Sequence, residues 1–182
     1  MRALFTVHAG EFLVGEFIER KFRRANVWVP TKDSGIDLLV TDSKNKKSVS
    51  LQVKFSRDFL PTHMPTLFQK PLRACGWWTI NRNKLVSSVA DYWILALFGF
   101  EHRSTDFVII PPRELRKRLE TIHGKQITFQ SYLWVTENNN CWETRGLKRQ
   151  EQVLISQGQF VDLRRNLTPY LNNWESIKKL DR

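Results

Sequence analysis

The sequence predicts an α/β fold in which a central mixed β-sheet is flanked by helices. Apolar residues recur with helical spacing over residues 9–25. Residues 48–56 alternate strictly between polar and apolar, which is the period of a half-buried strand. A length of 182 residues suits one domain with a sizeable core. We therefore expect one domain over 1–182, with its core motifs within about 9–100 and a helical elaboration at about 150–182.

The helix expected at residues 9–25 carries two acids, Glu11 and Glu16. At about 100° per residue, Glu11 borders the apolar stripe, whereas Glu16 lies on the side that bears other charged residues. We therefore favour Glu11 over Glu16 for a buried, functional role. The purely structural explanation of Glu11 is an acid favoured by the dipole at the start of a helix.

A short strand and a β-hairpin are expected next. Residues 27–30 form the short strand, and Pro30 ends it. Asp33, in the loop that follows, is either a turn former or a further metal-binding acid. Residues 36–40 and 49–55 are strand-like and flank a charged turn, so they predict a hairpin.

The hairpin would bring three polar side chains to one edge of the sheet. Gln52 and Lys54 are two residues apart, so they project from the same face of their strand. Strand pairing could place Asp37, at the start of the first strand, beside them. Divalent metals prefer hard oxygen ligands, and a nearby lysine can orient an attacking water or offset charge on a phosphate. The alternative is that these are the ordinary polar residues of an exposed strand face.

These residues resemble the motif of the PD-(D/E)xK superfamily. This is the restriction-endonuclease-like group of nucleases, which includes Holliday-junction resolvases, restriction enzymes and intron homing endonucleases. Ile36-Asp37 stands where the family has Pro-Asp, and Gln52-Val53-Lys54 stands where it has Asp/Glu-x-Lys. Glutamine at this position departs from the common pattern, although active members with this variant exist.

The resemblance implies a restriction-endonuclease-like core and a Mg2+-dependent DNA endonuclease in which Mn2+ can replace Mg2+. Asp37 would be the central metal ligand, and Glu11 would bind a second metal or a coordinated water. Gln52 and the backbone carbonyl of Val53 would complete the shell, while Lys54 would position the attacking water. Cleavage of both strands requires two active sites, so the resemblance also implies a homodimer or homotetramer.

Several functions stay open within and beyond this resemblance. Homing, restriction, and junction or repair nucleases are all compatible with the motif. The glutamine variant also fits a nuclease fold that has lost catalysis and kept DNA binding. A third hypothesis is an interaction protein whose basic surface meets an acidic partner.

The charge of the chain favours a polyanionic partner, and we expect double-stranded DNA. Lys and Arg number 29 against 18 acids, for a formal net charge of +11. A proline-containing loop over 57–73 and a helix over 113–119 carry basic residues that could contact phosphate. A plain connector explains the loop equally well, and a charge run on a helix is usually just a solvated face. The candidates are Arg57, Lys70 and Arg73 in the loop, and Arg113, Arg116 and Lys117 on the helix.

Other features of the sequence favour a cytoplasmic protein. Cys75 and Cys141 show no paired spacing, so we expect reduced, buried thiols. The first residues lack a credible signal peptide. The longest apolar run, around residues 92–100, is too short to cross a bilayer, so no membrane partner is expected.

The remaining elements are predicted from shorter patterns. Most of the tryptophans are expected in the core. A turn is expected at 81–84, and a terminal helix dented by Pro169 at 162–179. Strands are expected at 76–80, 91–98, 106–110 and 127–135.

Overall fold

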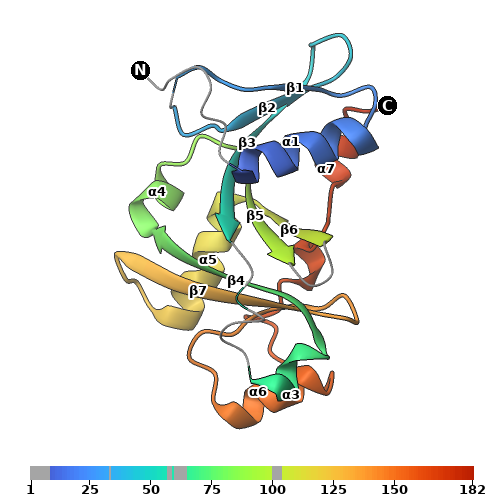
Figure 1. The fold of residues 1–182 in the computed structure, drawn as a ribbon. Coiled ribbons are helices and arrows are strands. Elements are labelled where there is room, and N and C mark those ends of the chain that lie inside the picture. The colour runs from blue at the N-terminus through green and yellow to red at the C-terminus, as the bar shows by residue number, and fades with distance from the viewer. Residues whose placement is uncertain (1–8, 33, 57–58, 60–64, 100–103) are drawn as a thin grey trace.

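The computed structural model describes residues 9–32, 34–56, 59, 65–99 and 104–182. Two β-sheets pack against each other through a shared core, and helices cover their outer faces (Figure 1). The helices are α1 (Ala9–Lys21), α3 (Thr66–Gln69), α4 (Arg82–Val86), α5 (Pro112–His123), α6 (Arg149–Ser156), α7 (Glu175–Lys178) and the 3-10 helix η1 (Thr168–Tyr170). The strands are β1 (Asn26–Trp28), β2 (Leu38–Thr41), β3 (Ser48–Ser56), β4 (Leu72–Asn81), β5 (Tyr92–Gly99), β6 (Ser104–Ile110), β7 (Thr128–Thr136) and β8 (Cys141–Glu143).

The larger sheet has five strands in the order β1-β2-β3-β5-β6. Strands β3 and β5 are parallel and the other neighbours are antiparallel, so the sheet is mixed. The carboxylate of Asp91 accepts hydrogen bonds from the Ser50 backbone N–H and hydroxyl at 2.8 and 2.7 Å, which ties the start of β5 to β3. The expected fold class, α/β with a central mixed sheet flanked by helices, is confirmed.

The outer face of this sheet packs against α1 and the C-terminal segment. The alternation in β3 turns Leu51 and Val53 toward Val14 and Ile18 of α1. Trp174 joins them from the far end of the chain, with its ring 4.8 Å from that of Phe17. Each fully buried aliphatic or aromatic side chain contributes about 1.5–3 kcal/mol through the hydrophobic effect.

The smaller sheet has three antiparallel strands in the order β4-β7-β8 and shares the central core with the larger sheet. Alternate residues of β7, such as Leu133 and Trp134, face opposite sides. Leu133 packs into the core between the sheets, together with Leu115 and Leu119 of α5. Trp134 packs on the far face, under α3 and α6, with Phe68 and Ile155.

Gly10 allows α1 to lie directly on β3. A Cβ atom added at Gly10 would be 2.5 Å from the Cβ of Phe55 and 3.4 Å from a methyl carbon of Val53, and the first distance is too short for any real contact. Only glycine lets the helix backbone come this close to the strand. The contact fixes the start of α1, and with it Glu11, against the strand that carries Gln52.

The expected terminal helix at 162–179 is wrong. Most of this segment is extended or turned, and only η1 and the four-residue α7 are helical. Asn166 bridges Trp142 and Leu171 bridges Val108, so the chain pairs with strands instead of forming its own helical hydrogen bonds. Pro169 lacks an N–H donor and favours the same outcome.

Three further expectations need correction. The turn expected at 81–84 is the start of α4, because the Asn81 side chain caps it by accepting the N–H groups of Asn83 and Lys84. Part of the expected 57–73 loop is ordered structure, since α3 occupies Thr66–Gln69 and β4 begins at Leu72. Of the helical elaboration expected at about 150–182, the first part is the separate helix α6, whose bounds the sequence did not indicate.

The other sequence predictions agree with the structure apart from their ends. The first helix ends at Lys21 instead of residue 25. The strands expected at 91–98, 106–110 and 127–135 correspond to β5, β6 and β7. None of the helices in the described part of the chain has the length and apolar character needed to cross a bilayer. The buried tryptophans are Trp78, Trp93, Trp134, Trp142 and Trp174, whereas Trp28 and Trp77 are about half exposed.

Candidate functional site

Asp37 lies directly before β2 and is only 6% exposed. Its backbone N–H donates to the Leu51 carbonyl at 2.8 Å. Its Oδ2 atom accepts the backbone N–H of Val53 at 2.8 Å and also the side-chain amide of Gln52. The carboxylate therefore accepts a backbone N–H of β3 that would otherwise need a main-chain carbonyl. These hydrogen bonds fix its orientation.

Glu11 faces the same region from α1 and is 4% exposed. A hollow of about 430 Å³ is lined by Glu11, Asp37, Val53 and Lys54, together with residues 9, 10 and 55. Two acidic residues thus line one hollow. The competing acid, Glu16, is part of a surface ion pair in which its carboxylate lies 2.8 Å from Arg20.

Lys54 lines this hollow and a second one beside it. The second hollow, of about 400 Å³, is also lined by Asp37 and Gln52. The Lys54 ammonium lies 5.6 Å from the ring centre of Trp93, and the Trp93 indole N–H donates to the Ser88 hydroxyl at 2.9 Å. The residues predicted to act together, Glu11, Asp37, Gln52 and Lys54, are therefore gathered around two hollows that share Asp37 and Lys54.

Helix α4 and the loop after it add residues that the sequence analysis missed. Lys84, Ser87 and Ser88 line the second hollow opposite Asp37. Lys84 gives this hollow a second ammonium group suited to a phosphate. The available signal was Asn81, a preferred N-cap residue, which indicates that a helix and not a turn follows.

The donors at the site suit a small, hard cation. Glu11 and Asp37 supply carboxylate oxygens, which are the ligands that Mg2+ prefers. Among the described residues, no group of three or more His, Cys, Asp or Glu side chains is placed to hold a metal ion. Further ligands would have to be the Val53 carbonyl, waters or a substrate phosphate. The Gln52 amide donates to Asp37 in this structure, so it would have to turn its oxygen toward a metal to act as a ligand.

The basic residues proposed to contact DNA have different surroundings. Arg57 and the alternative ligand Asp33 lie outside the described residues. Lys70 is exposed after α3. Arg73 lies on β4, where its guanidinium donates to both oxygens of Asp106 at 2.9 and 2.7 Å. These bonds raise the pKa of Arg73 and commit its side chain to the protein.

The basic residues of α5 lie on a helix that packs against α4. Arg113 and Lys117 are exposed and Arg116 is partly buried. Leu115 and Leu119, on the same helix, are buried in the core between the sheets. Helix α5, which carries these basic residues, is thus anchored in the core next to the element that contributes Lys84.

No protein-family model, curated protein or solved structure matches this chain.

Proposed function

We propose that this protein is a metal-dependent endodeoxyribonuclease that hydrolyses phosphodiester bonds in double-stranded DNA. The observation that carries the proposal is that Glu11, Asp37 and Lys54 line adjoining hollows. These residues come from α1, the start of β2 and the middle of β3, so only the fold brings them together. Two carboxylates for a metal and a lysine for the phosphate are the groups that such hydrolysis requires.

Each residue would have a distinct role. Asp37, fixed by Val53 and Gln52, would present one oxygen to a divalent ion, and Glu11 would bind a second ion or a coordinated water. When bound, Mg2+ or Mn2+ lowers the pKa of a coordinated water and stabilises negative charge on the phosphate. Lys54 would orient the attacking water and offset that charge, while Lys84 would hold a neighbouring phosphate.

The charge of the whole chain supports DNA as the substrate. A formal net charge of +11 favours long-range attraction to a polyanion. Cleavage of both strands would use two copies of the site, as in a homodimer or homotetramer. We also infer a cytoplasmic location, since Cys75 and Cys141 are buried as thiols and not joined in a disulfide, and burial raises the pKa of the Cys141 thiol.

Cleavage of supercoiled plasmid tests the proposal. Wild-type protein should nick or linearise the plasmid with Mg2+ or Mn2+ and not with EDTA. Asp37→Asn and Lys54→Ala should each lower the rate at least about a hundred-fold, because each removes charge that acts on the phosphate or its metal. Asp42→Asn, in the β2–β3 turn, is the matched control and should cleave like wild type. If Asp37→Asn cleaved plasmid at the wild-type rate, Asp37 would not belong to the catalytic site.

The second candidate function is a DNA-binding module without catalysis. The hydrogen bond from the Gln52 amide to Asp37 favours it, because this carboxylate is already partly satisfied without a metal. This hypothesis predicts salt-sensitive DNA binding, with no cleavage under any metal and no loss of binding in Asp37→Asn.

A further inference from the structure

A separate hollow of about 490 Å³ lies on the far face of the smaller sheet, next to α3 and α6. Its walls are mainly aromatic and its rim is basic, which distinguishes it from the two hollows around Asp37. The residues that matter here are Phe68, Trp77, Tyr132, Trp134, Arg145 and Arg149.

The aromatic wall offers a surface on which a planar ring can stack. Trp77 is 44% exposed, although it lies in the middle of β4. Deeper in the hollow, Phe68 and Trp134 are in ring contact, with centroids 5.2 Å apart. The Trp134 indole N–H is buried and has no hydrogen-bond partner among the described residues.

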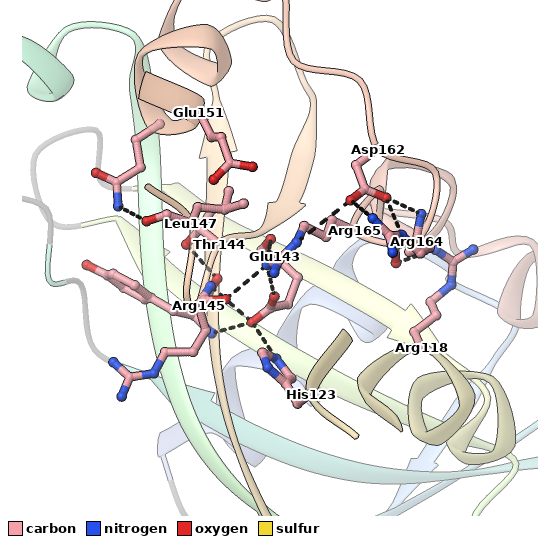
Figure 2. A network of polar contacts seen from close by, with 12 residues as sticks. Arg118, His123, Glu143, Thr144, Arg145, Leu147, Glu151, Asp162, Arg164 and Arg165 are labelled. Carbon is pink, nitrogen blue, oxygen red and sulfur yellow. Dashed lines mark hydrogen bonds and ion pairs between the residues drawn. The ribbon is translucent and has the colours of Figure 1, made fainter. Parts of the chain in front are cut away.

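The rim of the hollow carries two guanidinium groups. The Arg149 guanidinium carbon lies 4.3 Å from the ring centre of Phe68, so the side chain is held over the wall. Arg145 is exposed, and its guanidinium points away from the buried Glu143 (Figure 2). Guanidinium groups bind phosphate through paired hydrogen bonds. Aromatic walls below a basic rim match a nucleotide, which joins a flat base to a phosphate.

The strand that carries Trp77 is held against β3, the strand that carries Lys54. The Trp77 N–H donates to the Ser56 hydroxyl at 2.9 Å, and Ser56 is two residues after Lys54 on the same face of β3.

We propose that this hollow binds a DNA base that has left the base stack. The base stacks on Trp77, and Arg145 and Arg149 bind the phosphate next to it. This inference rests on the proposed function for its substrate class, and it adds that the substrate contains an unpaired base. The volume of the hollow, about 490 Å³, is in the range of pockets that bind small ligands.

Binding of a short oligothymidylate (about 12 nucleotides) in EDTA tests the inference, with an abasic oligonucleotide of equal length as the reference. Both probes carry the same phosphates, so their difference isolates base stacking. Wild-type protein should bind the oligothymidylate about ten-fold more tightly or better. Equal binding of the two probes overturns the proposal without any variant.

Variants then locate the preference. Trp77→Ala should abolish it, and Trp28→Ala, which removes another half-exposed tryptophan on β1, should leave it unchanged. Arg149→Ala should weaken binding of both probes equally. A preference retained in Trp77→Ala, or tighter binding of oligouridylate than of oligothymidylate, overturns the proposal. The binding measurement needs neither metal nor cleavage. The binding preference can therefore be present when plasmid cleavage is absent, and absent when cleavage is present.

Discussion

Buried acids at the β2–β3 edge and in the C-terminal half of the chain have different partners. Glu143, on β8, is 1% exposed, and its carboxylate lies 2.8 Å from Arg165 and 3.3 Å from His123 (Figure 2). Asp106, on β6, is likewise paired with Arg73. The hydrogen bonds described for the Asp37 carboxylate come instead from an amide side chain and a backbone N–H.

This difference separates structural acids from a candidate functional acid. An arginine that holds both oxygens of a carboxylate offsets its charge and leaves little capacity for a ligand. Neutral donors orient a carboxylate and leave its charge available to a cation. Asp37 also lines two hollows, whereas Glu143 is enclosed between β7, β8 and the 162–166 segment. Four predictions test the contrast.

The largest expected effect is on stability, at Arg165. Arg165→Ala would leave Glu143 buried without its main cation, and breaking a buried pair in this way costs about 3–5 kcal/mol. Chemical denaturation should show this loss. Arg164→Ala is the control, because Arg164 is exposed and solvent screens its pair with Asp162, so it should change stability far less. Equal losses in the two variants would contradict the structural role of Glu143.

The second prediction concerns the contact of α1 with β3. Gly10→Ala places a Cβ 2.5 Å from the Cβ of Phe55, so the helix must shift. Overpacking of this kind costs about 1–3 kcal/mol, and the shift should also slow plasmid cleavage by moving Glu11. Gly15→Ala is the matched control on the same helix, since its Cβ would be 3.7 Å from Val27. It should stabilise the protein by up to about 1 kcal/mol through helix propensity. If Gly10→Ala cleaves plasmid at the wild-type rate, Glu11 is not part of the catalytic site.

The third prediction concerns the metal. Gln52→Glu adds a carboxylate beside Asp37, so Mg2+ should bind about ten-fold more tightly, or ~1.4 kcal/mol. The Mg2+-induced rise in Tm should then exceed that of wild type, and it should disappear in Asp37→Asn. A rise that is the same in all three proteins would show that Mg2+ binds elsewhere. This measurement does not depend on catalysis.

The smallest effect is expected at Asp162. Hydrogen bonds from the Arg164 side chain hold the pKa of the Asp162 carboxyl below its ordinary value of 3.8. An acid whose pKa is lowered by folding stabilises the protein at pH values above its ordinary pKa. This contribution is lost as the pH falls through the lowered pKa. Asp162→Asn should therefore cost less than about 1 kcal/mol at neutral pH and nothing in strong acid. A difference that persists in strong acid would exclude the ion pair as its cause.

Local patterns predicted the elements around the candidate site well. The alternation over 48–56 matches β3, because Leu51 and Val53 of its apolar face pack against α1. Its polar face is buried as well, at Ser50, Gln52 and Ser56, which the alternation did not predict. The helical position of Glu11 matches its burial, and Glu16 is at the surface as expected. Lys84 was missed because α4 is a single short turn of helix with almost no periodic pattern.

The C-terminal third was predicted poorly for a different reason. Apolar residues of the 162–179 segment, such as Leu167 and Trp174, do reach the core. They reach it from extended chain and turns, because Asn166 and Asn172 form hydrogen bonds with β8 and β6 instead of within a helix. Apolar spacing alone could not distinguish the two conformations.

The sequence by itself determined the mixed α/β class, the β2–β3 hairpin and the residue types of a possible metal site, because these follow from periodicity and side-chain chemistry. Only the tertiary structure decided that Glu11 and Lys54 share a hollow with Asp37, and that Arg73 is bound to Asp106. Those outcomes depend on contacts between residues far apart in the chain, such as Gly10 against Phe55, and no local pattern records them.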